Sequence, residues 1–149
     1  MSYSKENGQV VLRMSREDKP IYYVASRASI PERGAMWRKF RKQGVSIVSS
    51  WIDEDGDGCT ESFEELWQRI ESEIKSSTAF LLYVEFHDFP LKGALVEAGM
   101  ALAMGKPVLV FKPYFALDER TFKPLGSWAK HPGVTIMTSS IHDFLRCTV

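Results

Sequence analysis

The sequence predicts an α/β protein in which a doubly wound parallel sheet of about five strands lies between two layers of helices. Short apolar runs alternate with segments of helical periodicity along most of the chain. Two of these runs, residues 79–86 and 106–111, are almost continuously apolar, which is typical of strands buried on both faces of a parallel sheet. The length of 149 residues suits one domain, which we expect over residues 19–149.

The first strand and helix follow a polar segment. Residues 1–18 predict a tail with at most one short edge strand, because apolar residues are few there. The run at 21–26 (IYYVAS) predicts a strand. Residues 31–44 predict a helix, because they begin with proline and end with Gly44.

The second unit repeats this order. Residues 45–51 (VSIVSSW) predict a strand, and residues 62–77 predict a helix after a polar loop. Ser62 and Glu65 form a capping-box pattern at the start of that helix. The sequence therefore predicts a second β-α unit.

The remaining segments continue the alternation. They comprise a buried strand, a helix rich in small residues, another buried strand, and a last strand and helix after an irregular stretch at 112–130. In chain order these elements are expected at 79–86, 91–105, 106–111, 133–137 and 140–147. Open sheets of this kind bind ligands beyond the carboxyl ends of their strands, where the strand order reverses.

Composition and charge exclude several function classes. The 19 basic residues balance the 19 acidic ones, so charge does not indicate a nucleic-acid partner. Cys59 and Cys147 lie far apart and no long apolar run is present, so we expect a cytoplasmic protein without a membrane partner. His87, His131 and His142 lack metal-ligand spacing, and we expect neither a zinc site nor a cofactor.

Glu97 is the strongest candidate for chemistry. It falls early in the third predicted helix, among small residues (Gly93, Ala94, Ala98 and Gly99) that let a ligand approach closely. The positive end of the helix would favour its ionised form, which a carboxylate nucleophile requires.

Residues 79–111 resemble the nucleoside 2-deoxyribosyltransferase superfamily. Its members carry a buried strand, an acidic loop with glycine and a helix of the form VExGxAxAxGKPV, and residues 96–108 of this chain read VEAGMALAMGKPV. IYYVAS is similar to the family's first strand, and HPGV at 131–134 is similar to a late element. The resemblance implies a flavodoxin-like fold, and a homo-oligomer is expected because relatives often complete their sites across a subunit interface.

The resemblance also implies roles for individual residues. Glu97 would attack the anomeric carbon of a nucleoside or nucleotide, releasing the base, and water or a second base would complete the reaction. Tyr23 matches the tyrosine that orients this carboxylate. Asp88 matches the acidic residue that protonates the base, the alternative being that Asp88 only caps its loop. Trp51, at the end of the second predicted strand, would cover the sugar, stack on the base or pack in the core, and Gly93 would leave room for the ligand.

The loop after the first strand predicts an anion site. Ser26, Arg27, Ser29 and Arg33 lie near a helix N-terminus, a setting that holds phosphate. In the family, members that act on nucleoside monophosphates have a serine-rich loop with arginine in this place. The alternative is that Ser29 only caps the helix that starts at Pro31.

The chain departs from the family pattern at one position, which keeps other functions open. Many members carry an aspartate before the buried strand, where this chain has Arg69, Ser77 and Thr78. A TIR-like domain that cleaves NAD or assembles signalling complexes is one alternative, although residues 92–96 lack the tryptophan and cysteine expected before its glutamate. A catalytically silent nucleotide-binding protein is the other.

A second motif matches a calcium-binding loop. Asp53, Asp55, Asp57 and Glu64 have the spacing of EF-hand ligands, with Gly58 at the turn position. An EF-hand needs a helix before this loop, however, and the preceding residues predict a strand. The more economical interpretation is a polar loop without metal.

Overall fold

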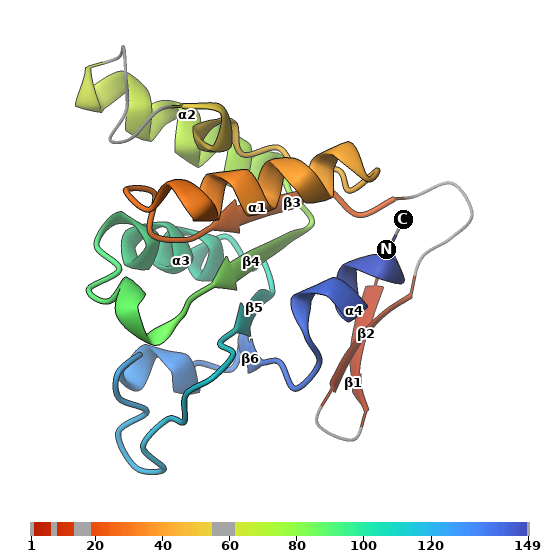
Figure 1. Ribbon diagram of the computed structural model, residues 1–149, viewed down its shortest axis with the longest axis vertical. Coiled ribbons are helices and arrows are strands. Elements are labelled where there is room, and N and C mark those ends of the chain that lie inside the picture. The colour runs from red at the N-terminus through yellow and green to blue at the C-terminus, as the bar shows by residue number, and fades with distance from the viewer. Residues whose placement is uncertain (1, 7–8, 14–18, 55–61, 149) are drawn as a thin grey trace.

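Four parallel strands form the central sheet of the computed structural model, which describes residues 2–6, 9–13, 19–54 and 62–148. The strands β3 (Tyr22–Ala25), β4 (Ala79–Tyr83), β5 (Val108–Phe111) and β6 (Val134–Ile136) lie side by side in this order (Figure 1). Every residue of the first three strands is buried. The predicted α/β fold with a parallel sheet is confirmed.

The second predicted strand is reduced to a single parallel bridge between Tyr22 and Ile47 on the outer side of β3. The amide of Tyr22 donates to the Ser46 carbonyl at 2.9 Å, and the amide of Val48 donates to the Tyr22 carbonyl at 2.9 Å. With this bridge included, the strand order is the 2-1-3-4-5 order of flavodoxin-like sheets. The order reverses between β3 and β4.

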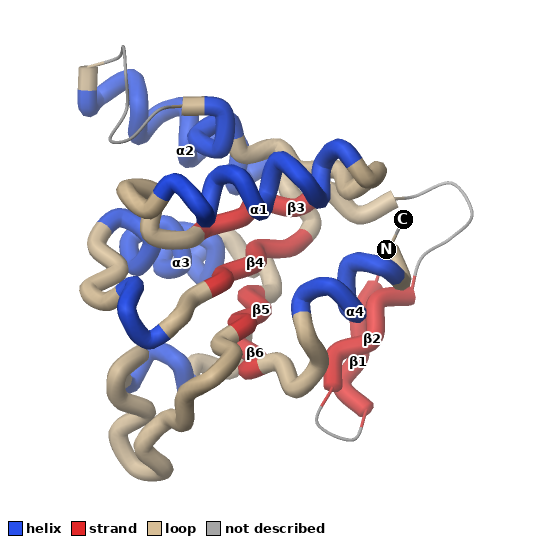
Figure 2. The backbone as a smooth tube through the Cα atoms, in the orientation of Figure 1, coloured by secondary structure: helices blue, strands red, loops and turns tan. Residues whose placement is uncertain are grey.

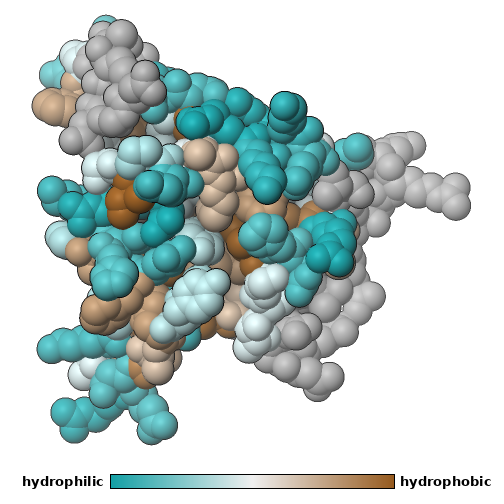
Figure 3. All heavy atoms as spheres, in the orientation of Figure 1, coloured by the Kyte–Doolittle hydropathy of each residue, from teal (hydrophilic) through white to brown (hydrophobic). Residues whose placement is uncertain are grey.

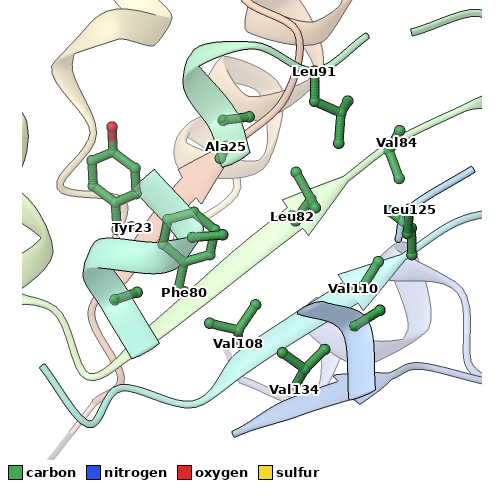
Figure 4. Packing of buried hydrophobic residues seen from close by; sticks show 14 of the residues in the cluster. Tyr23, Ala25, Phe80, Leu82, Val84, Leu91, Val108, Val110, Leu125 and Val134 are labelled. Atoms are coloured by element: carbon green, nitrogen blue, oxygen red, sulfur yellow. The ribbon is translucent and has the colours of Figure 1, made fainter. Parts of the chain in front are cut away.

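Helices cover both faces of the sheet (Figures 1 and 2). The helices α1 (Pro31–Lys42) and α4 (Ile141–Arg146) contribute to one core cluster, and α2 (Phe63–Ser76) and α3 (Gly93–Ala103) contribute to the other. Figure 4 shows the second cluster, with Tyr23 and Phe80 next to each other at one end. The predicted three layers are therefore present.

Neighbouring side chains of β3 serve different layers. Tyr22 packs in the cluster beneath α1 and α4, whereas Tyr23 packs in the cluster beneath α2 and α3, as the alternation of side chains along a strand requires.

The outer face of α1 carries the exposed residues Glu32, Arg38, Lys39, Arg41 and Lys42, and Figure 3 shows a hydrophilic surface over this helix.

The helix boundaries follow local sequence signals. α1 has proline at its first position, and the Ser62 side chain caps α2 by accepting a hydrogen bond from the Glu65 amide at 3.2 Å. After α3, Gly105 adopts a φ of +74°, a conformation that favours glycine. Among the described helices, none is long and apolar enough to cross a membrane.

Two segments differ from the sequence-based expectation. The chain near the N-terminus forms two antiparallel strands, β1 (Ser2–Glu6) and β2 (Gln9–Arg13), where at most one short strand was expected. The end of the second predicted strand turns instead into a 3-10 helix, η1 (Ser50–Asp53). Two further short 3-10 helices, η2 (Phe86–Asp88) and η3 (Ser127–Lys130), lie in loops.

Candidate active site

Tyr23 and Glu97 meet at the point where the strand order reverses. Tyr23 is fully buried on β3, and Glu97 lies one turn into α3, which follows β4. The Tyr23 hydroxyl donates a hydrogen bond to Oε1 of Glu97, while the Tyr23 ring stacks on Phe80 with 5.4 Å between ring centroids. The structure thus brings together the expected nucleophile and the residue expected to orient it.

Burial dominates the electrostatics of Glu97. It raises the pKa of Glu97 to about 7; the hydrogen bond from Tyr23 opposes this effect, and the charge of Glu73 adds to it. The helix N-terminus, expected from the sequence to favour the charged form, acts only within the first turn. The pKa of Tyr23 is raised well above 10 by burial and by Glu97, so Tyr23 remains a hydrogen-bond donor at neutral pH.

A cavity of about 540 Å³ opens beside Glu97. Its walls come from the loop after β3, from η1, from α2 and from the start of α3. The lining residues are Ser26, Arg27, Ala28, Ser29, Trp51, Glu54, Phe63, Leu66, Trp67, Ile70, Leu91, Lys92, Gly93, Ala94 and Glu97. This volume is within the range of small-molecule sites.

Gly93 leaves space beside the Glu97 carboxylate. A methyl group at this position would lie 3.8 Å from Oε2 of Glu97 and 3.9 Å from Cη2 of Trp67. The tip of the Trp67 ring and the carboxylate therefore border the same small volume. An incoming atom in this volume would face Oε2, because Oε1 is the oxygen that accepts the bond from Tyr23.

Trp51 forms part of the cavity wall and is held in place by the sheet. Its indole nitrogen donates to the Val24 carbonyl at 2.7 Å, and its ring lines the cavity. The side chain also packs against both core clusters. The core-packing alternative is therefore confirmed for Trp51, whereas its expected roles toward a sugar or a base stay predictions.

The loop after β3 contributes polar groups to the rim. Ser26 donates to the Ala25 carbonyl at 2.7 Å and accepts from the Trp37 indole at 3.0 Å, so its single O–H donor is already used. The Nε of Arg27 donates to the Ser29 hydroxyl at 3.2 Å. Ser29 does not cap α1, whose N-cap residue is Ile30.

Arg33 and Asp88 form a pair outside the cavity lining. The Arg33 guanidinium donates to Oδ2 and Oδ1 of Asp88 at 2.8 and 2.7 Å, and the Glu85 amide donates to Oδ2 at 2.9 Å. The Asp88 side chain is 0% exposed, and neither residue lines the cavity. The expected roles of Asp88 as the acid and of Arg33 as a phosphate ligand do not fit this geometry.

The calcium-loop match gains no support from the residues that the structure describes. Asp55, Asp57 and Gly58 lie outside them. The Asp53 carboxylate is bound by Arg41 through two hydrogen bonds of 2.8 and 2.7 Å, and Glu64 is exposed in the first turn of α2. Within the described ranges, no three potential ligands lie close enough together to hold a metal ion.

Several residues of the cavity could not be assigned from the sequence, among them the polar or aromatic residues Glu54, Phe63, Trp67 and Lys92. Trp67 has the helical spacing of a core residue relative to Phe63 and Ile70, and this pattern does not distinguish a core from a cavity wall. Glu54 belonged to a polar loop. It receives a hydrogen bond of 2.7 Å from Arg69, one of the residues found near the position of the missing aspartate.

A scan of protein-family models finds no match to this chain, and a search of curated proteins finds none either.

Proposed function

We propose that this protein cleaves the N-glycosidic bond of a nucleoside or nucleoside 5′-monophosphate, with Glu97 as the nucleophile. The buried hydrogen bond from Tyr23 to Glu97, beside a cavity of about 540 Å³, is the observation that carries this proposal. Nucleophilic carboxylates of this kind form covalent glycosyl intermediates. The resemblance of residues 96–108 to the deoxyribosyltransferase helix supports the same assignment.

In the first step, Oε2 of Glu97 attacks the anomeric carbon while the bond to the base nitrogen breaks. The base leaves with the bonding electron pair and takes a proton from water. Tyr23 holds Oε1 and so orients the carboxylate toward the volume beside Gly93. The sugar is then joined to Glu97 through an ester bond.

In the second step, the ester is resolved. Water attacks the anomeric carbon, the bond from this carbon to Oε2 breaks and regenerates the carboxylate, and the released proton neutralises the hydroxide left by the first step, which gives hydrolysis. Attack by the nitrogen of a second base, with its proton lost in the same way, gives transfer. The cavity walls suit the substrate, because Trp51, Trp67 and Phe63 offer aromatic surface to a planar base.

The rim suits an anionic group on the sugar. Arg27 and Lys92 line the cavity together with the Ser29 hydroxyl and the first residue of α3. Two cations and a helix N-terminus are the features that bind phosphate in proteins. A 5′-monophosphate is therefore the expected form of the substrate.

The test is chromatographic detection of free base after incubation with deoxynucleosides, deoxynucleoside monophosphates, ribonucleotides and NAD. Base release from deoxy substrates by the wild type, lost in Glu97→Gln, is the predicted result. Nicotinamide release would instead indicate NAD cleavage. No release from any substrate, with a second base also supplied, would overturn the proposal in favour of a binding protein.

A further inference from the structure

Charged groups divide the cavity into two chemically opposite sides. The cations Arg27 and Lys92 come from the loop after β3 and from the residue before α3, on the side of β4. Glu54 follows η1, and its carboxylate contacts Arg69 of α2. It lies after the segment in which Ile47 forms the bridge to Tyr22. Because β3 lies between β4 and the segment that contains Ile47, Lys92 and Glu54 follow elements on opposite sides of β3.

Glu54 is held in a fixed position within this wall. Its Oε1 accepts a hydrogen bond of 2.7 Å from Nη2 of Arg69, and its side chain is only 19% exposed. No described hydrogen bond uses Oε2 of Glu54, and the residue lines the cavity beside Trp51. A carboxylate in this state presents an acceptor, and no donor, to a bound ligand.

The Glu54 acceptor lines the same cavity as the aromatic residues Trp51 and Trp67. A planar base against Trp51 and Trp67 would have its sugar beside Glu97, because Gly93 leaves space between the carboxylate and Trp67. A 5′-phosphate on the cationic side turns the base toward the opposite side, which is that of Glu54. The edge of the base then faces an acceptor that cannot donate.

We propose that Glu54 is a specificity-determining residue that selects bases carrying an exocyclic amino group. An amino group donates to Oε2, whereas a carbonyl oxygen in the same place brings lone pairs against a carboxylate and leaves it unpaired. The site thereby favours cytosine over uracil and adenine over hypoxanthine. This inference rests on the proposed function, since it assigns the substrate class of the same cavity.

The test compares matched bases on one sugar phosphate. We expect kcat/KM of the wild type for deoxycytidine monophosphate to exceed that for deoxyuridine monophosphate at least tenfold, with the same order for the adenine and hypoxanthine nucleotides. Glu54→Gln, whose amide donates as well as accepts, should reduce this preference at least tenfold. Glu71→Gln, an exposed position on α2, should leave it unchanged. An unchanged preference in Glu54→Gln would overturn the inference.

Binding separates this inference from the proposed function. The same four nucleotides are titrated against Glu97→Gln protein, with and without Glu54→Gln, by tryptophan fluorescence. A preference for amino bases that depends on Glu54 supports the inference even if the wild type releases no base. Equal binding of all four, or no binding, overturns it. If Glu54→Gln does not fold, Glu54→Asp, which withdraws the carboxylate by one methylene group, should narrow the preference in both assays.

Discussion

The hydroxyl of Tyr23 donates a buried hydrogen bond to the carboxylate of Glu97, although the two residues are 74 positions apart in the chain. β3 supplies the donor and α3 supplies the acceptor, so the bond forms only when the sheet is assembled. Burial raises the pKa of Glu97, and the bond from Tyr23 lowers it. The hydrogen bond therefore keeps the buried carboxyl group of Glu97 ionisable near neutral pH.

Base release should depend on the ionisation of Glu97. Its pKa of about 7 predicts that kcat/KM rises with pH below about 7 and levels off above it, because the attacking form is the carboxylate. Tyr23→Phe removes the hydrogen bond that lowers this pKa. The midpoint of the profile should then move upward by roughly one to two pH units, the effect of one hydrogen bond to a charged group.

Tyr22→Phe provides the control for that profile. Tyr22 neighbours Tyr23 but packs on the opposite face of the sheet, so this variant should leave the midpoint unchanged. Rates measured across pH 5–9 with one nucleotide check both variants. Equal midpoints for Tyr23→Phe and the wild type would contradict the assigned role of Tyr23.

Glu97 should also reduce stability at neutral and alkaline pH. Its pKa rises from 4.5 to about 7 on folding, so the folded state binds a proton more tightly than the unfolded state. Stability is therefore lost as pH rises from about 4.5 to about 7. Glu97→Gln removes this loss, and at pH 8 the variant should exceed the wild type by about 1–3 kcal/mol in free energy of unfolding.

Urea titrations at pH 4.5 and pH 8 measure this difference. The gain from Glu97→Gln should be largest at pH 8 and close to zero at pH 4.5. A variant less stable than the wild type at pH 8 would show that the charged carboxylate is well solvated or paired in the folded protein.

The Arg33–Asp88 pair should support the fold rather than the reaction. Asp88→Asn removes the negative charge that pairs with the largely buried Arg33 guanidinium and replaces one accepting oxygen by a donor, which should destabilise the protein by about 3 kcal/mol. Base release at a temperature where the variant is folded should stay within tenfold of the wild type. A fall in base release of a hundredfold or more, typical of removing a general acid, would show that Asp88 takes part in the reaction.

Asp53→Asn is the matched control for this pair. It breaks a doubly hydrogen-bonded pair with Arg41 in which the side chains are 51% and 39% exposed. Solvent-exposed pairs contribute little, so the cost should remain below about 1 kcal/mol. Thermal melts of the two variants side by side test the contrast between the buried pair and the surface pair.

Much of the fold could be predicted because its signals are local. Apolar runs predicted the buried strands, and Pro31 and Ser62 predicted where two helices begin. The second strand was overestimated because a side chain replaces backbone pairing there. The amide of Val24 donates to the Ser49 hydroxyl at 2.7 Å, and the chain then turns into η1.

The site was less accessible to sequence reasoning because its partners are distant in the chain. Arg33 and Asp88 are 55 positions apart, and each taken alone had the features of a functional residue. Only the folded chain shows that the two satisfy each other. Glu54 was missed for the converse reason, since nothing local indicates that this loop residue faces a cavity.

Gly93→Ala should block the approach to Glu97 without disturbing the fold. The added methyl group would make ordinary contacts with Oε2 of Glu97 and with Trp67, so stability should be unchanged or slightly higher. Base release should fall at least tenfold, because the methyl group occupies the space of the reacting carbon. Gly99→Ala, whose methyl group would meet nothing within 4 Å, should retain activity.

A glycosyl ester on Glu97 can be detected by mass spectrometry of the protein after reaction with a 2′-fluoro-arabino nucleotide, whose fluorine slows loss of the sugar from an ester. We expect a protein species heavier by one glycosyl phosphate, with the added mass on the peptide that contains Glu97 and absent from Glu97→Gln. Base release without this adduct, or an adduct on another residue, would contradict this expectation.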